Sequence, residues 1–184
     1  MSGLVSNPMD KPEASKVTLF GIADYAWNIN GFKSDEAWKE GIVRLYPQAA
    51  EAMQAFVDHN SDQGPNGHGY RREESVNIAP VVTRVLEAAR EGRVVQSDTA
   101  LLKKEFSRMA AAAPVIREKV DNPRLMKEIG AWVDAFEQLG MAGQHAVAAL
   151  ENSSPKAAVT ALVQATQALA AMDRISREHN QQGQ

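Results

Sequence analysis

The chain has 184 residues, enough for one domain with a substantial core, and 44% of them are hydrophobic but only 6% are aromatic. A net charge of −3 without a basic stripe excludes a field that attracts nucleic acid or an anionic membrane. The absence of cysteine excludes disulfides, thiol catalysis and cysteine-ligated zinc. Alanine-rich composition with few aromatic residues predicts closely packed helices and therefore an all-α fold.

The first predicted element is a very short strand. Leu4 and Val5 are the only strand candidates, and their apolar run breaks at Asn7-Pro8. A buried strand needs neighbours on both sides. Since the chain offers no second strand to pair with Leu4 and Val5, we expect a vestigial strand. We interpret the chain as the C-terminal fragment of a larger protein.

A helix of unusual apolarity is predicted over residues 13–28. Asp10 has the position of an N-cap, with Pro12 in the first turn and Glu13 three residues on, close to a capping box. Apolar side chains on more than one face predict burial on several sides. One face, which we expect to lose its cover in the chain alone, carries Val17, Phe20 and Trp27.

A second helical region is predicted over residues 34–59, capped by Ser34 and broken or kinked at Pro47. A glycine-rich loop, residues 60–75, follows it. Loops of this length inside a compact unit tend to be functional or specifically docked. We therefore expect this loop to be ordered.

The rest of the chain is predicted to form four helices, over residues 77–91, 97–120, 123–151 and 154–178. Two of them start with a capping side chain followed by proline, at Asn122-Pro123 and Ser154-Pro155. Short links between long helices predict antiparallel neighbours. The expected fold is an all-α multi-helix bundle with a short vestigial N-terminal strand.

Two motifs resemble one enzyme family. They are GLVSNPM…PEASK…IADYAWN over residues 3–28 and HNSD.GPNGHGYRREES over residues 59–75. They are similar to the end of the catalytic barrel and the following helical region of bacterial family 84 glycoside hydrolases, which are β-N-acetylglucosaminidases often labelled O-GlcNAcase or hyaluronidase. The resemblance implies that residues 1–33 are a remnant of the last strand and helix of the barrel and that residues 34–184 are a helical domain.

The resemblance assigns one substrate-binding residue, Asn7. In the family, the Asn of this segment follows the last barrel strand and hydrogen-bonds hydroxyl groups of the bound N-acetylglucosamine. Active sites of barrels lie at the C-terminal ends of their strands. From the residues alone, Asn7 ahead of Pro8 is more simply an Asx turn or a cap; the resemblance favours a sugar contact in the intact enzyme.

The sequence contains no candidate catalytic residue. The family's hydrolysis is substrate-assisted and uses two adjacent aspartates of the barrel, and no adjacent pair of aspartates occurs in this chain. The neighbours Glu73 and Glu74 lie at a loop-to-helix junction, where carboxylates stabilise a helix N-terminus. We therefore expect this piece to be inactive by itself.

Two further patterns each have two interpretations. Around the loop, His59, His68, Asp58 and Asp62 match no metal-binding spacing, so hydrogen bonds that fix the loop are preferred to a metal site. Aromatic residues are interpreted as core rather than as a sugar-stacking platform, because they occur at helical spacing: Trp27, Trp38, Trp132, Tyr25, Tyr46 and Tyr70.

The sequence is therefore interpreted as the C-terminal helical region of a β-N-acetylglucosaminidase that removes terminal β-linked N-acetylglucosamine from glycoconjugates. The alternative is a free-standing helical interaction or dimerisation module. The expected partners are the chain's own upstream catalytic barrel, a glycoconjugate substrate in the intact enzyme and a second copy in a homodimer. We expect no cofactor, metal, nucleic acid or membrane partner, and a bacterial, periplasmic or secreted location if the parent enzyme carries a signal peptide.

Overall fold

The computed structural model describes residues 10–60 and 75–182. In these ranges the chain forms only α-helices, which confirms the predicted all-α fold; the predicted strand at Leu4 and Val5 lies outside the described residues. The helices are α1 (Lys16–Trp27), α2 (Ser34–Leu45), α3 (Ala50–Asp58), α4 (Ala79–Arg90), α5 (Gln96–Lys119), α6 (Pro123–Glu151) and α7 (Pro155–Gln182).

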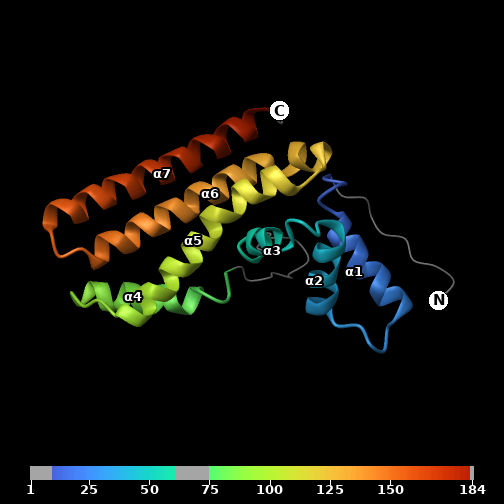
Figure 1. The fold of residues 1–184 in the computed structure, drawn as a ribbon, viewed down its shortest axis with the longest axis horizontal. Helices are drawn as coiled ribbons and strands as arrows, with labels where there is room; N and C mark the ends of the chain where they lie inside the picture. The colour runs from blue at the N-terminus through green and yellow to red at the C-terminus, as the bar shows by residue number, and fades with distance from the viewer. Residues whose placement is uncertain (1–9, 61–74, 183–184) are drawn as a thin grey trace.

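The three long helices, α5, α6 and α7, form the body of the molecule (Figure 1). α6 lies between the other two, and α6 and α7 form an antiparallel hairpin. α3 and α4 pack against α5, whereas α1 and α2 stand at the end of the molecule opposite the α6–α7 turn. The short links between long helices thus produce the antiparallel neighbours that the sequence predicts.

The core lies mainly where α3, α5 and α6 meet. Its largest fully buried side chains are Ile42, Met109, Ile116, Leu125 and Val133. A smaller cluster joins α4 to the first part of α5 and the last part of α6, through Val81, Val85, Leu102 and Val147. Burial of these apolar side chains provides most of the stability of such a bundle.

Glycine allows α5 and α6 to approach closely. A Cβ atom at Gly140 would lie 2.6 Å from the backbone nitrogen of Ala110 and 2.9 Å from the carbonyl oxygen of Phe106. Both are backbone atoms, so a side chain at this position forces the helices apart. Gly140 therefore fixes the separation of the two helices at their crossing.

One predicted helix start and two predicted caps are wrong. α1 begins at Lys16 rather than near Glu13, and Asp10 is not its cap, because residues 12–15 form a turn and Ser15 is the N-cap residue. α2 begins at Ser34, as predicted, but Ser34 is its first residue rather than its cap: Lys33 is the N-cap residue and makes no side-chain cap bond. The predicted break at Pro47 is present, so that the region 34–59 consists of two helices, α2 and α3.

The face of α1 that was expected to lose its cover is only partly exposed. Val17 is 5% exposed and belongs to the main core, and Phe20 is half-buried against Gly41 of α2. Trp27, in contrast, is 92% exposed. Neighbouring helices of this chain thus cover the start of α1, and its end is left bare.

Candidate functional site

The predicted substrate-binding residue, Asn7, lies outside the described residues, as do His68, Asp62, Glu73 and Glu74. The described residues that flank the segment 61–74 are informative, because they show how both of its ends are held. The candidate site is therefore built from three features: the anchor of this segment, a groove beside it, and the surface and contacts of α1.

His59 joins both ends of the 61–74 segment to α5. Its Nδ1 atom lies 2.7 Å from Ser75 Oγ, and its Nε2 atom lies 2.9 Å from Glu105 Oε1. The backbone N–H of Ser75 also donates to the carbonyl oxygen of Asp58, at 2.8 Å. Because a carboxylate only accepts, His59 donates from Nε2 to Glu105, while its Nδ1 atom is within hydrogen-bond distance of the Ser75 hydroxyl, which can either donate or accept.

Arg108 extends this contact into a network. Its guanidinium donates to Asp58 Oδ2 at 3.0 Å and lies 2.7 Å from Glu105 Oε1. Burial alone would raise the pKa of the Glu105 carboxyl, but hydrogen bonds from Arg108 and His59 bring it below its ordinary value. Asp58 and His59, two of the four residues considered as metal ligands, are thus engaged by protein groups that hold the chain in place.

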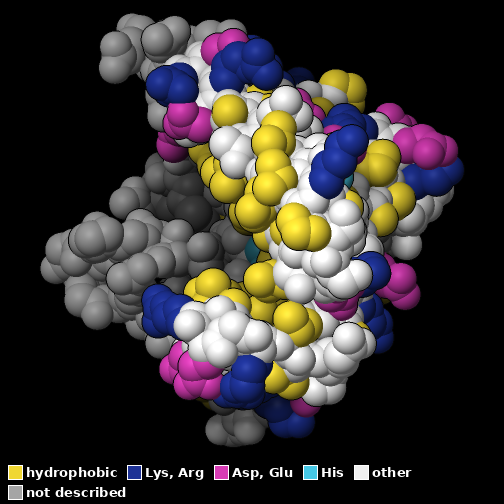
Figure 2. All heavy atoms as spheres, turned by 90° about the vertical axis from the view of Figure 1, so that its left-hand side faces the viewer, with side chains coloured by type: hydrophobic (Ala, Val, Ile, Leu, Met, Phe, Trp, Pro, Cys, Tyr) yellow, Lys and Arg dark blue, Asp and Glu magenta, His cyan; other side chains and the backbone are white. Residues whose placement is uncertain are grey.

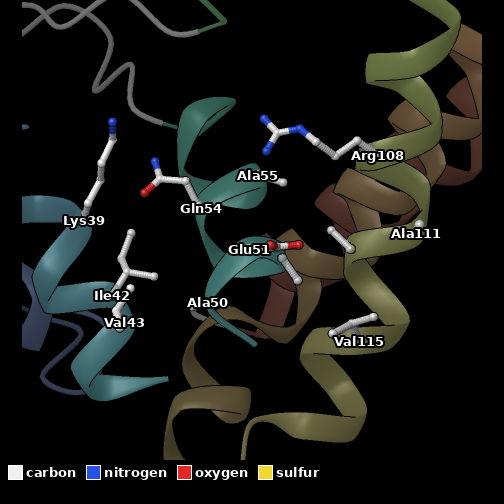
Figure 3. A pocket seen from close by; sticks show the side chains of 12 residues that line it. Lys39, Ile42, Val43, Ala50, Glu51, Gln54, Ala55, Arg108, Ala111 and Val115 are labelled. Carbon is white, nitrogen blue, oxygen red and sulfur yellow. The ribbon is translucent and has the colours of Figure 1, made fainter. Parts of the chain in front are cut away.

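An apolar groove of about 580 Å³ lies between α2, α3 and α5. Figure 3 shows Lys39, Gln54 and Arg108 together at one end of it. The rest of its lining is mainly small or aliphatic: Ile42, Val43, Ala50, Ala52, Ala55, Ala111, Ala112 and Val115, with Glu51. A single carboxylate among apolar groups provides no pair for acid–base chemistry on a glycoside.

Glu128 on α6 holds the turn that precedes α1. Its carboxylate accepts from the backbone N–H groups of Glu13, at 3.1 Å, and Ala14, at 2.9 Å. The side chain of Glu13 in turn accepts from Asn122 Nδ2 at 2.7 Å, and Asn122 caps α6 through a bond from the Leu125 N–H. Hydrogen bonds from Lys16 and Asn122 lower the pKa of the Glu13 carboxyl.

Nothing in the sequence near Glu13 predicts this contact, because its partner lies 115 residues away. Tyr46 is buried in the same region, where burial raises the pKa of its phenol and the charges of Glu13 and Glu128 raise it further. The start of α1 is therefore fixed to the start of α6 by a group of polar side chains, which we call the Glu128 cluster: Glu13, Asn122 and Glu128.

The end of α1 presents large apolar side chains to solvent. Trp27 is almost fully exposed, and Leu19, Tyr25 and Ile29 are also exposed. An almost fully exposed tryptophan at a helix end is typical of a residue that another surface covers. Of the aromatic residues predicted to be core, Trp38 packs against the main cluster and Tyr46 belongs to it. The prediction is wrong for Tyr25, Trp27 and Trp132, which are exposed, and Tyr70 lies outside the described residues.

Two kinds of feature are absent from the part of the chain that the structure describes. No group of three or more His, Asp or Glu side chains there is placed to bind a metal ion. None of the helices, read over the same residues, is both long and apolar enough to cross a bilayer.

Comparison with known proteins places both halves of the chain in one family. A family model described as beta-N-acetylglucosaminidase matches residues 1–58, and a model described as the bacterial GH84 post-catalytic domain matches residues 74–183. These matches confirm the resemblance that the two sequence motifs carry.

Solved structures agree with this assignment. The structure of CpGH84D is similar with a TM-score of 0.83 at 31% identity, over 90% of this chain and 28% of that one. The structure of CpGH84B has a TM-score of 0.81 at 22% identity, over 91% of this chain and 29% of that one, which shows the shared fold. The chain thus spans less than a third of the length of either structure. By its family matches, this chain belongs to the bacterial family 84 of glycoside hydrolases, and its residues 74–183 are a post-catalytic helical domain of that family.

Proposed function

We propose that the chain is the C-terminal helical region of a β-N-acetylglucosaminidase, and that α1 and the bundle brace the catalytic barrel of the same enzyme. The observation that carries this proposal is the bare end of α1. Trp27 is 92% exposed within a segment that matches the beta-N-acetylglucosaminidase model. A tryptophan in this position loses favourable contacts unless another surface covers it.

The enzyme's reaction is the hydrolysis of terminal β-linked N-acetylglucosamine from glycoconjugates, of the O-GlcNAcase or hyaluronidase type. In the substrate-assisted retaining mechanism, the acetamido oxygen of the sugar attacks the anomeric carbon while two carboxyl groups stabilise the intermediate and transfer protons. The chain contains no adjacent aspartates, so this pair comes from the barrel. Asn7 contributes hydrogen bonds to the sugar hydroxyls, for which an amide offers both a donor and an acceptor.

The bundle contributes rigidity to this site. The Glu128 cluster fixes the turn at Glu13 and Ala14, which follows the Asn7 segment in the chain. A substrate-binding side chain performs best when the backbone on either side of it is held. The Glu128 cluster thus supports the barrel's last segment from outside the barrel.

The test compares the 184-residue chain with a longer protein that includes the upstream barrel, both assayed on a chromogenic N-acetylglucosaminide. We expect hydrolysis by the longer protein and none by the chain alone. Asn7→Ala in the longer protein should lower kcat/KM by the equivalent of ~1–3 kcal/mol of transition-state stabilisation, the cost of a lost sugar hydrogen bond. Activity of the purified chain alone, or an unchanged kcat/KM for Asn7→Ala, would contradict the respective part of the proposal.

The second candidate function is a free-standing helical interaction module. It is favoured by the apolar side chains that α7 exposes, including Leu162 and Leu169. The reading frame upstream of Met1 separates the two candidates. A frame that continues into a barrel with an adjacent aspartate pair supports the enzyme; a stop codon directly upstream supports the module.

A further inference from the structure

The turn that joins α1 to α2 contains an asparagine followed by a glycine, Asn30-Gly31. The backbone N–H of Gly31 donates to the carbonyl oxygen of Asn28, at 3.1 Å, and closes a β-turn over residues 28–31. Asn30 is exposed, and among the described residues its side chain has no hydrogen-bond partner. The amide of Asn30 can therefore rotate toward the backbone that follows it.

Water has access to this pair of residues. The turn lies at the end of the molecule opposite the α6–α7 turn (Figure 1), away from the end that Figure 2 faces, where hydrophobic side chains are exposed among charged ones. Gly31 is itself exposed and also lines a pocket of about 440 Å³ between α1 and α2. Charged side chains line the same pocket, Asp24, Lys33 and Glu36 among them, and a polar pocket of this size holds water.

A glycine after an asparagine leaves the backbone nitrogen open to the asparagine side chain. Glycine has no Cβ atom, so that its nitrogen is little obstructed and the backbone around it turns easily. When the Gly31 nitrogen attacks the side-chain amide carbon of Asn30, a C–N bond forms and closes a five-membered succinimide ring. The original bond from that carbon to the amide nitrogen breaks, and ammonia leaves with the proton of the Gly31 N–H. Water then opens the ring at either carbonyl group, which yields aspartate or isoaspartate.

We propose that Asn30 is a site of spontaneous deamidation in the folded protein. The net reaction consumes one water molecule and releases one ammonia molecule, and it needs no oxidant, cofactor or enzyme. An exposed amide that is close in the chain to Trp27 and Ile29 thereby becomes a carboxylate. The proposal goes beyond the proposed function, since neither the barrel nor a sugar takes part in the reaction.

Asn28 provides the comparison within the same turn. It is exposed like Asn30, but the residue that follows it is Ile29. The branched Cβ atom of isoleucine crowds the backbone nitrogen and restricts the rotation that the attack requires. We therefore expect Asn30 to deamidate at least about tenfold faster than Asn28.

Two other asparagines are protected in ways that Asn30 is not. Asn60 donates from its side-chain amide to the carbonyl oxygen of Phe56, at 2.7 Å, which restrains the amide. Asn122 precedes Pro123, whose nitrogen has no hydrogen to lose, and its side chain also caps α6.

The hydrogen bond within the turn slows the reaction but does not prevent it. The Gly31 N–H must leave the carbonyl oxygen of Asn28 before the nitrogen can attack. A single exposed bond opens frequently, so folding should slow the deamidation of Asn30 by no more than about tenfold relative to the unfolded chain. The reaction should be faster at mildly alkaline pH, because the nitrogen attacks after it loses its proton.

The products change the turn in charge and in length. Either product adds a negative charge to the turn that precedes the ion pair between Lys33 and Glu36. Isoaspartate also adds one methylene group to the backbone, which alters the geometry of the bond from Gly31 to Asn28. A charge at this place would weaken apolar contacts at the bare end of α1; this consequence rests on the proposed function, whereas the reaction itself does not.

The experiment incubates the 184-residue chain in mildly alkaline buffer and follows each asparagine by tandem mass spectrometry of its peptides. Among the described asparagines, Asn30 should be the first to gain the mass of an amide-to-carboxyl exchange, with isoaspartate among the products. Asn66-Gly67, the second such pair in the sequence, lies outside the described residues and is followed in a peptide of its own. Hydroxylamine, which cleaves a succinimide, should cut the folded chain between residues 30 and 31.

Two variants and an unfolded sample complete the test. Gly31→Val places a branched side chain after Asn30 and should slow its deamidation at least about tenfold. Asn30→Gln should abolish cleavage by hydroxylamine at this position, because a glutamine side chain would have to close a larger ring. The proposal is overturned if Asn30 reacts no faster than Asn28 in the folded chain, if it reacts only in urea, or if Gly31→Val does not slow it. Circular dichroism ensures that the native samples and the variants are folded throughout the incubation.

Discussion

Removal of the Glu128 carboxylate should release the start of α1 from the bundle. In Glu128→Ala the backbone N–H groups of Glu13 and Ala14 lose their acceptors, which lie at 3.1 Å and 2.9 Å. A hydrogen bond to a charged group contributes about 1.5–3 kcal/mol when buried, and a helix-capping side chain about 0.5–2 kcal/mol. Because Glu128 is only half-buried, we take the lower end of these ranges and expect a total loss of about 2 kcal/mol.

Two comparisons make this prediction specific. Glu128→Gln keeps one oxygen acceptor without charge and should lose roughly half as much free energy of unfolding, about 1 kcal/mol. Glu118→Ala is the control, since Glu118 is exposed and, among the described residues, its ion pair is with its neighbour Lys119, at 2.6 Å. Its effect should lie within about 0.5 kcal/mol.

Urea unfolding measures the free energies, and hydrogen exchange followed by mass spectrometry locates the change. A loss of 2 kcal/mol corresponds to roughly thirtyfold faster exchange at the amides of Glu13 and Ala14, if they exchange by local opening. The reasoning is refuted if Glu128→Ala is no more destabilising than Glu118→Ala. It is also refuted if exchange at these two amides does not change.

Two further predictions concern packing and pH. Gly140→Ala should destabilise the chain by about 1–3 kcal/mol, because the new Cβ atom meets the backbone of Ala110. Gly130→Ala should stabilise the chain by up to about 1 kcal/mol, because nothing lies within 4 Å of its Cβ position and alanine favours a helix. Thermal melts distinguish the two variants, and equal effects would contradict the packing argument. Asp98 accepts two hydrogen bonds from Arg84, at 2.9 Å and 2.8 Å, which lower its carboxyl pKa. The stabilisation that the Asp98 carboxylate gives to the folded state is therefore fully present above its pKa in the unfolded state. It is lost as pH falls through its lower pKa in the folded state. Asp98→Asn should consequently lose less stability than the wild type between neutral and acid pH in unfolding titrations, and equal losses would contradict this assignment.

Local signals in the sequence predict the helices well. Asn122 before Pro123 is an example: the structure shows the Asn122 Oδ1 atom accepting from the Leu125 N–H at 3.0 Å, as a cap should. Pro47 likewise ends one helix and allows another to begin, because it lacks an N–H and its ring collides with the preceding turn. In both cases the determining atoms lie within four residues of one another.

Contacts between distant residues explain the errors. Asp10 and Glu13 have the spacing of a capping box, yet the N–H groups of this turn are taken by Glu128, and Glu13 itself turns to Lys16 and Asn122. The predicted ordered loop lies mostly outside the described residues, at 61–74. Beside it, His59 bonds to Ser75 and to Glu105, and Glu105 lies 46 residues from His59. No periodicity or motif identifies such a partner, because its position depends on how the helices pack.

The two family matches divide the chain near residues 58 and 74, but the described core does not divide there. Val17 and Ile42 from the first match share one apolar cluster with Met109, Ile116 and Val133 from the second. The Glu128 cluster, and the bond between His59 and Glu105, cross the same boundary through polar groups. Because these contacts are mutually dependent, a displacement of the bundle would move the turn before α1 as well. The helices of the post-catalytic domain and the described residues of the first family match, 10–58, therefore form one structural unit.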